Sequence, residues 1–516
     1  MGNNEEIVKN DAGKLVAEVE KKIEKEQSEK IREKVIEEAK LNEHIERSRK
    51  YSLKDSASVN ATVGLGDNYI SAYAVALGAS AAHIGLLTSI PNLIAPLAQL
   101  ATSKSMEKNS RKQIFSRAIL IQSLLWLPII LISFLFLKDI KQAPILLVIF
   151  YTVYALFGNF AAPAWISWMG DLINPKEAGK FLGLRNKIGG ITGLISMIIG
   201  GIILDFFRHE AEITAKIYLG FIGFGIIFFL AMIFRLLSRH FVLKQHEPHF
   251  RFEKDHYFSF FQFIKKIPSS NYGKFSLYVA LIVLATNIAG PYYTIYLLRN
   301  LKFSYIKFML ISVSSAVATF LFISKWGKFA DKHGNVQMLK ITSLLIPIIC
   351  FLWPITAFLP VQYIFPFLLA INFISGYAWA GFNMAAGNFV FEAATPQRRG
   401  LCSAYSSIMN GLGVVIGATI GSILVTHINI SFINVILFVS LISGVARYSV
   451  FFFMRKSIKE IREVKEAHWK MIPLASDILD AQSYITNNIL LKFRKNKKTE
   501  VIPDIPLLHE DSKEKK

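Results

Sequence analysis

One acidic residue stands out because it interrupts a long apolar stretch of the chain. Asp67 lies near the middle of residues 56–78, a run that is long enough to cross a bilayer. An ionisable side chain at such a depth is costly and usually marks the pathway of an ion or a substrate. At 100° per residue, Asp67 shares one helical face with residues too small or too polar to suit lipid: Asn60, Gly64, Ser71, Ala74 and Gly78. This pattern predicts that Asp67 faces the interior of a helix bundle, where it binds a proton or a cationic substrate; the alternative is a helix-packing role.

Amide and aromatic side chains recur on other apolar runs and are candidates for binding a substrate or an ion. They are Asn68, Tyr73, Tyr154, Asn159, Asn287, Tyr292, Asn372, Trp379 and Asn383. Under a local shift of 219 residues, Asn287 corresponds to Asn68 and Tyr292 to Tyr73. For any one of these residues alone, hydrogen bonding between helices is the better interpretation.

Several kinds of chemistry find no support in the sequence. It has no nucleotide loop of the form GxxxxGK[ST], no catalytic triad and no zinc-ligand spacing. Its two cysteines, Cys350 and Cys402, indicate neither a disulfide framework nor a metal site. No lysine or arginine is predicted near the middle of the membrane, which argues against phosphorylated substrates and favours a neutral or cationic solute. We therefore predict no cofactor, no metal and no enzymatic activity.

The elements that carry these residues are predicted to be membrane-spanning helices. The chain has 516 residues, of which 53% are hydrophobic, and about 20 apolar residues in a helix cross the hydrocarbon core. Runs this long and this evenly apolar must be helices, because open strands leave backbone groups unpaired in lipid. Twelve such runs occur, near residues 56–78, 82–103, 113–137, 143–170, 179–206, 214–236, 274–298, 304–326, 336–358, 361–391, 400–427 and 431–455.

The distribution of charge predicts the orientation. The formal net charge is +21, which in a soluble protein would raise nucleic acid as a partner. Here most of the excess lies in alternate breaks between the apolar runs: 104–117, 176–187, 235–274, 325–340 and 398–399. By the positive-inside rule, these breaks and both termini are cytoplasmic in a multi-pass protein of the cell membrane. The predicted partners are therefore a small solute and the lipid bilayer, and not nucleic acid.

An internal repeat divides the chain into two halves of six spans. A shift of 221 residues places Asp171 on Glu392 and Gly179 on Gly400, and it also aligns a proline and two further glycines in the same register. An even number of spans in each half makes the two repeats parallel in topology. The predicted organisation is a charged cytoplasmic helical arm, a first half, a central loop, a second half and a cytoplasmic tail: residues 1–54, 55–236, 237–273, 274–455 and 456–516.

The arm reads as one polar helix over residues 5–50. Oppositely charged residues lie four apart, as in Glu18–Lys22 and Glu43–Arg47. A solvated helix explains this pattern, and a coiled-coil arm that binds a cytoplasmic partner is the alternative.

The segment "GKFADKHG", residues 327–334, resembles a loop signature of the major facilitator superfamily of secondary transporters. The family pattern is filled by Gly327, Asp331, Lys332 and Gly334, although Asn335 and Val336 replace the usual basic pair. With the two parallel halves, the resemblance covers roughly residues 55–455. The equivalent loop of the first half, "SMEKNSRKQ", keeps only the basic character of the signature.

The resemblance implies an all-α fold of about 12 transmembrane helices in two pseudo-symmetric halves. Spans one, four, seven and ten would line a central cavity, so the polar residues on them should converge there. Asp331 would lie beside the start of span five, near Gly179, with Arg185 deeper, and would form a latch that breaks when the cytoplasmic side opens. Its alternative is an ordinary loop aspartate that caps itself. Asp171, Glu392 and Gly400 are also predicted to take part in gating.

The resemblance also implies the function. We predict a transporter that moves a small solute by alternating access, coupled to an ion or a proton. A lipid flippase is a variant of this hypothesis. A non-transporting membrane sensor or scaffold, which presents its N-terminal helix to a cytoplasmic partner, is the alternative.

Overall fold

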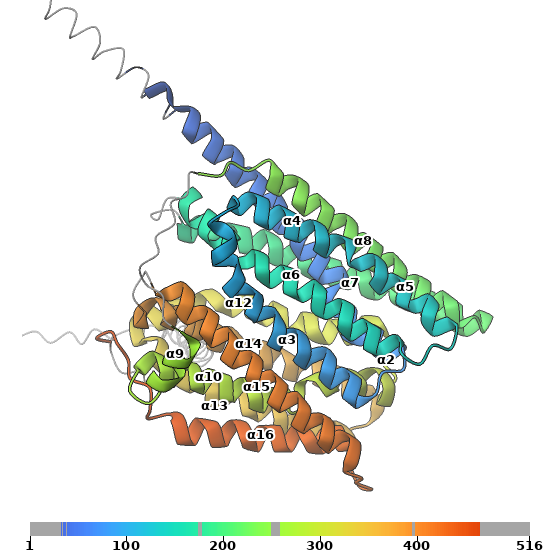
Figure 1. Cartoon of the computed structure of the whole chain (residues 1–516). Helices are drawn as coiled ribbons and strands as arrows, with labels where there is room; N and C mark the ends of the chain where they lie inside the picture. The colour runs from blue at the N-terminus through green and yellow to red at the C-terminus, as the bar shows by residue number, and fades with distance from the viewer. Residues whose placement is uncertain are drawn as a thin grey trace, which may run out of the picture.

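The computed structural model describes residues 32, 35–37, 39–173, 178–248, 259–394 and 398–464. Across these residues the chain is helical and contains no strand, and the long helices run side by side (Figure 1). Eleven of the described helices are long and apolar enough to cross a membrane. A further helix, residues 39–65, continues through a short break into residues 70–76 and forms the first span. The predicted all-α membrane fold is confirmed.

The first half follows the predicted order closely. After the helix over residues 39–65 come η1 (Asp67–Tyr69), α2 (Ile70–Ala76), α3 (Ala81–Met106), α4 (Arg111–Leu124), α5 (Trp126–Leu137), α6 (Ala143–Leu172), α7 (Ala178–Thr214) and α8 (Ile217–Leu243). Span three consists of α4 and α5 in series. Span six ends at Leu243, beyond the predicted boundary at residue 236.

The second half repeats this order after a short connecting helix. Its elements are α9 (Phe260–Lys266), α10 (Asn271–Asn287), η2 (Gly290–Tyr292), α11 (Tyr293–Ile295), η3 (Tyr296–Asn300), α12 (Tyr305–His333), α13 (Asn335–Leu352), η4 (Trp353–Ala357), α14 (Val361–Ala393), α15 (Arg399–His427) and α16 (Val435–Met454). The predicted cytoplasmic tail is described only as far as residue 464, and most of the predicted arm lies outside the described residues.

The first helix joins the arm to the membrane without interruption. Residues 39–65 form one helix, and the exposed residues near its start give way to increasingly buried ones from Ser48 onward. The arm therefore enters the bundle as a direct extension of span one. Figure 1 shows this helix emerging at one end of the molecule. We call this end the N-terminal face and the other end the opposite face.

Paired tyrosines show how the two halves correspond. The Tyr69 hydroxyl donates to the carbonyl of Met197, and the Tyr292 hydroxyl donates to that of Ala418. One turn further along, the hydroxyls of Tyr73 and Tyr296 bond those of Ser133 and Thr356. Spans one and seven therefore correspond under a shift of 223 residues, not 219. Tyr292 is the counterpart of Tyr69, because each is the last residue of a 3-10 turn at the same place in its span.

The halves meet mainly at the opposite face. One cluster of buried hydrophobic residues there draws on both halves, whereas the buried clusters towards the N-terminal face belong to one half each. Cross-half hydrogen bonds join Asp205 to the backbone N–H groups of Tyr305 and Ile306, and Arg299 to the carbonyl of Ala79. Among the described residues, no hydrogen bond or ion pair joins the halves at the N-terminal face. The hydrogen bonds described between the halves therefore lie at the opposite face, while α3 and α15 also pack closely across the halves, where a Cβ atom at Gly411 would overlap the carbonyl of Asn92.

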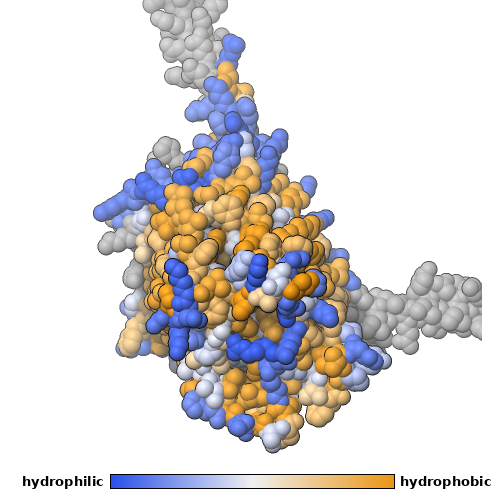
Figure 2. All heavy atoms as spheres, turned by 90° about the vertical axis from the view of Figure 1, so that its right-hand side faces the viewer, coloured by the Kyte–Doolittle hydropathy of each residue, from blue (hydrophilic) through white to orange (hydrophobic). Residues whose placement is uncertain are grey.

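The surface agrees with a membrane-spanning protein. Figure 2 looks onto the opposite face and shows hydrophilic residues gathered there, with hydrophobic surface around them. Large apolar side chains stay exposed along the outer helices, including Ile166, Phe206 and Val445. Such a surface would be unfavourable in water and is expected where lipid chains surround the helices.

Candidate substrate cavity

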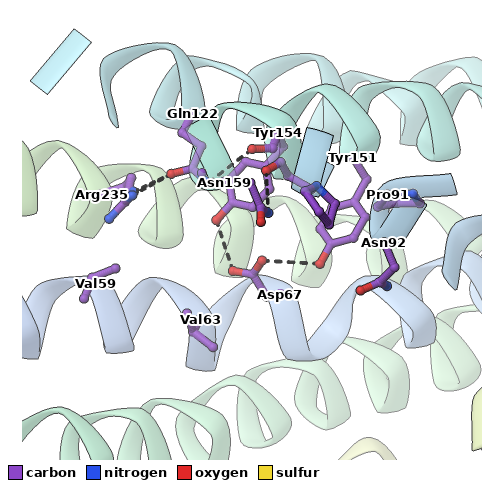
Figure 3. Close-up of a pocket in the computed structure, with 13 residues that line it drawn as sticks. Val59, Val63, Asp67, Pro91, Asn92, Gln122, Tyr151, Tyr154, Asn159 and Arg235 are labelled. Atoms are coloured by element: carbon purple, nitrogen blue, oxygen red, sulfur yellow. Dashed lines mark hydrogen bonds between the residues drawn. The ribbon is translucent and has the colours of Figure 1, made fainter. Parts of the chain in front are cut away.

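Asp67 lies at the break in the first helix. The ring of Trp126 packs against Gly66 so closely that a Cβ atom at residue 66 would overlap it. The next three residues, Asp67–Tyr69, form a single 3-10 turn before the helix resumes. This change of winding points the half-buried Asp67 side chain towards α6 (Figure 3). A broken helix leaves polar backbone groups inside the bundle, which is tolerated where they line a cavity.

The cavity beside Asp67 has a volume of about 350 Å³. This lies at the lower end of the range for small-molecule sites. Its walls come from the first helix, α3, α4, α6 and α8, all in the first half: Val59, Val63, Asp67, Pro91, Asn92, Pro96, Gln122, Tyr151, Tyr154, Ala155, Gly158, Asn159 and Arg235.

Two tyrosines of α6 hold the carboxylate of Asp67. The Tyr154 hydroxyl donates to one oxygen at 3.1 Å, and the Tyr151 hydroxyl lies 3.4 Å from the other. Three residues apart on one helix, the two rings stack with their centroids 5.7 Å apart. The carboxylate therefore has hydrogen-bond donors on one side and the open cavity on the other. A group in this position is able to exchange a proton or contact a solute.

Arg235 lies on the cavity wall, and this corrects the expectation that no cation lies deep in the bundle. The charge pattern of the sequence predicts Arg235 in the basic break after span six. In the structure, α8 continues for two further turns to Leu243, so Arg235 is inside the helix and only 7% exposed. Its Nε and Nη2 donate to Oε1 of Gln122 at 3.0 and 2.6 Å. The argument against phosphorylated substrates, and for a neutral or cationic solute, loses its basis.

A chain of polar contacts connects Arg235 to Arg185 through Ser238 and Asp55. Ser238 donates to Asp55 at 2.7 Å, and Arg235 approaches Ser238 at 3.4 Å. Asp55 in turn forms an ion pair of 3.0 Å with Arg185, whose guanidinium stacks over the ring of Trp165. Arg185 thus serves the first half internally, between span one and span five.

Of the predicted binding residues, Asp67, Tyr154 and Asn159 share this cavity. The Asn159 side-chain oxygen accepts a hydrogen bond of 2.9 Å from Gln99. Sequence reasoning missed Tyr151 and Gln122, which lie on the same wall. The spacing of Tyr151 and Tyr154 on one helical face was the available signal for the first of these.

The remaining predicted binding residues lie outside this cavity. Tyr73 and Tyr292 are fully buried in the hydrophobic core. Asn287 and Asn372 each donate to a carbonyl of their own helix, four residues earlier. Trp379 packs edge-on against Phe382, and both Asn68 and Asn383 are exposed. Their roles in binding stay predictions.

The predicted gating residues fall into separate contacts. Gly327, Asp331 and Lys332 lie in the last turns of α12, where Asp331 is exposed and makes no ion pair among the described residues. Gly334 ends this helix with a φ of 86°, a conformation that favours glycine. Gly179 and Gly400 lie in the first turns of α7 and α15.

The acids of the repeat each form an ion pair within their own half. Asp171 at the end of α6 pairs with Arg111, and Glu392 at the end of α14 pairs with Arg462 at 2.8 Å. Glutamates that follow the last span of each half cap the third span of the same half: Glu247 accepts from the backbone N–H of Arg111 in α4 at 2.7 Å, and Glu460 from that of Val336 in α13 at 2.9 Å. These contacts stabilise each half on its own.

The loop after α8 fixes the arm to the first half. The backbone N–H of His246 donates to Ser48 at 2.7 Å, and its ring stacks on that of His44 with centroids 5.4 Å apart. Burial lowers the pKa of His246 below its ordinary value, and the neighbouring His44 and Lys112 lower it further. The His246 imidazole therefore takes up a proton less readily than a free histidine, although the nearby Glu247 opposes this effect.

Comparison with known proteins identifies the family. The model of the Major Facilitator Superfamily matches residues 59–272 and 275–498, one segment for each half. The chain belongs to the major facilitator superfamily. This superfamily membership makes it a multi-pass membrane transporter of small solutes and not an enzyme.

Solved structures of transporters share the fold. A single-residue mutant of the nucleoside transporter NupG is similar at 15% identity with a TM-score of 0.61, over 79% of this chain and 100% of that one. The D-xylose-proton symporter is 14% identical with a TM-score of 0.60, over 82% of this chain and 99% of that one. A bacterial homologue of the iron transporter ferroportin in an inward-facing state is 13% identical with a TM-score of 0.59, over 80% of this chain and 99% of that one. At these identities the likeness concerns the fold alone. A search of curated proteins finds no match to the sequence.

Proposed function

We propose that this protein is a secondary active transporter that couples solute movement to protons through Asp67. The observation that supports it best is a carboxylate at a helix break, bonded by Tyr151 and Tyr154 and open to a cavity of about 350 Å³. A buried carboxylate is costly as an anion, so its protonation responds strongly to changes in hydration. Alternating access would change that hydration in each cycle. No ATP-binding loop is present in the sequence to supply energy instead.

The proposed orientation puts the N-terminal face in the cytoplasm. The basic breaks of the sequence join helices at this face, and the positive-inside rule assigns such breaks to the cytoplasm. Because the described hydrogen bonds between the halves lie at the opposite face, the described conformation would be inward-open. Asp67 would then exchange protons with the cytoplasm in this state. The outward-open state requires the opposite-face bonds to break.

Cysteine labelling tests this orientation. Single cysteines at Ser110 and Lys332 should react with an impermeant maleimide only from the cytoplasm, and one at Gln142 only from outside. All three positions are exposed, whereas the native Cys350 and Cys402 are buried and give little background. Reaction of Gln142 and Lys332 variants from the same side would contradict the proposed topology.

The proposed latch at Asp331 predicts a smaller effect. Asp331→Asn removes a carboxylate that would interact with the start of α7 when the cytoplasmic side closes. A charge at a helix N-terminus is worth about 0.3–1 kcal/mol, so the closed population should fall about two- to fivefold. Distances between spin labels at Ser110 and Lys332 would report this shift. Unchanged distances and transport rates would make Asp331 an ordinary loop residue.

A direct test of the function begins with a ligand. Purified full-length protein is screened by thermal shift against metabolites and drugs, because a ligand at 100 times its dissociation constant stabilises by about 2.7 kcal/mol. A stabilising ligand should then be taken up by proteoliposomes, with acidification of the receiving compartment. Uptake without proton movement would contradict proton coupling. Binding without any uptake would favour a sensor instead.

A further inference from the structure

Arg235 is a buried cation without a carboxylate partner in contact. Among the described residues, no carboxylate oxygen lies within 4.0 Å of its guanidinium nitrogens. Its bonds to the neutral side chains of Gln122 and Ser238 use three of its five N–H groups. An unpaired buried charge is costly, by several kcal/mol. A guanidinium kept in this state on a cavity wall is well suited to receive an anion.

The charges around the cavity balance only when Asp67 is ionised. Asp55 and Arg185 neutralise each other as an ion pair. Arg235 and Asp67 carry the remaining positive and negative charges, and they line the same cavity without touching. When Asp67 takes up a proton, the site holds one surplus positive charge. That surplus favours the entry of one negative charge.

We propose that the substrate carries a single negatively charged group, such as a carboxylate, that binds Arg235. A planar guanidinium matches a carboxylate in a two-point contact. The small cavity volume restricts the rest of the molecule to a compact organic body, which would contact Val59, Val63 and Pro91. The proposed substrate class is therefore a small organic monoanion.

The part of this inference that links anion binding to protons rests on the proposed function of Asp67. The charged and titratable groups that face Asp67 are Tyr151 and Tyr154 of α6 and Arg235 of α8. Protonation of Asp67 removes a like charge from beside the incoming anion, so the proton and the anion increase each other's affinity. By thermodynamic linkage, the proton raises the affinity for the anion by the same factor as the anion raises the affinity for the proton. The anion should bind more tightly as the pH falls.

The test compares carboxylic acids with their uncharged amides. Purified full-length protein is incubated with lactate, benzoate and nicotinate, and with lactamide, benzamide and nicotinamide, at mildly acidic and mildly alkaline pH. We expect at least one acid to raise the melting temperature, its amide to have no effect, and the affinity to be higher at acidic pH. Stabilisation by none of the acids, or equally by their amides, overturns the proposal.

Variants assign the effect to Arg235. Arg235→Gln should weaken binding of the acid at least tenfold, and Arg235→Lys should weaken it less because the charge remains. Gln122→Glu is a second variant, in which the side chain keeps its shape and the guanidinium gains a carboxylate partner within the protein. It should abolish binding of the acid, and it provides the test if Arg235→Gln misfolds. Arg239→Gln, one turn along α8 and outside the cavity, is the matched control. Full affinity in Arg235→Gln and Gln122→Glu overturns the proposal.

The outcomes separate this inference from the proposed function. Acid binding through Arg235 that does not depend on pH supports the monoanion and contradicts coupling through Asp67. Proton-coupled uptake of an amine or an uncharged solute supports coupling and overturns the monoanion. A zwitterion whose affinity falls at acidic pH also overturns it, because Asp67 would then bind an ammonium group.

Discussion

Asp67→Asn protein should exchange its substrate across the membrane but should no longer accumulate it. One pH unit corresponds to 1.36 kcal/mol, so a carrier that moves one proton with each monoanion, without net charge, sustains an accumulation of about tenfold for each unit of gradient. The asparagine keeps the size of the side chain and its contacts with Tyr151 and Tyr154, but it cannot take up a proton. The expected accumulation ratio is therefore about one at every pH gradient. Uptake and counterflow in proteoliposomes measure the two activities separately.

The control for Asp67→Asn makes the same substitution at Asp139, outside the cavity. Asp139 lies in an exposed turn at the opposite face with a φ of 58°, a conformation that asparagine tolerates well. Asp139→Asn should accumulate substrate as the unaltered protein does. Loss of substrate binding in Asp67→Asn would indicate direct pairing with a cationic substrate instead. Normal accumulation would leave Asp67 with a packing role and would remove the main support for proton coupling.

Asp205→Ala should shift the population from the inward-open state towards the outward-open state. The carboxylate of Asp205, near the end of α7, accepts the backbone N–H groups of Tyr305 at 2.6 Å and Ile306 at 3.0 Å. These bonds cap the start of α12 from the other half. Loss of such a cap costs about 1–2 kcal/mol. Because this cost falls only on the state closed at the opposite face, the outward-open fraction should rise about tenfold.

Spin-label distances measure this shift. Labels at Gln142 and Phe358, both exposed at the opposite face, should move apart in Asp205→Ala, while labels at Ser110 and Lys332 should move closer. Glu210→Ala is a matched control, because it removes an acid from the same helix whose carboxylate makes no cross-half bond among the described residues. An Asp205→Ala distribution that equals the control would show that Asp205 does not hold the halves together.

The helices and their order are determined by the sequence because the membrane imposes a length on them. Residues 82–103 were predicted and α3 spans Ala81–Met106; residues 361–391 were predicted and α14 spans Val361–Ala393. Hydrocarbon thickness and the need to pair every backbone group leave few other arrangements for such runs. The importance of Asp67 also follows from the sequence, since a lone acid in an apolar run is conspicuous without any knowledge of its neighbours.

The composition of the cavity was decided by tertiary packing. Arg235 resembled a loop residue because charges near the end of an apolar run lower its hydropathy. Only the structure shows that α8 continues to Leu243 and that Arg235 contacts Gln122 and Ser238. Tyr292 was aligned with Tyr73 rather than Tyr69, and an error of four residues moves a side chain by more than one helical turn. Where Arg185 binds was equally hidden, because its partner Asp55 lies 130 residues away in the chain.

The sequence by itself thus determined the superfamily fold, the twelve spans and the single acid in the first of them, because these depend on local hydropathy and on motifs within one segment. Only the tertiary structure decided which cation shares the cavity with Asp67, which tyrosines bond it, and which face holds the halves together. Those properties depend on the rotation of each helix about its own axis and on side chains far apart in the sequence. Local hydropathy contains neither kind of information.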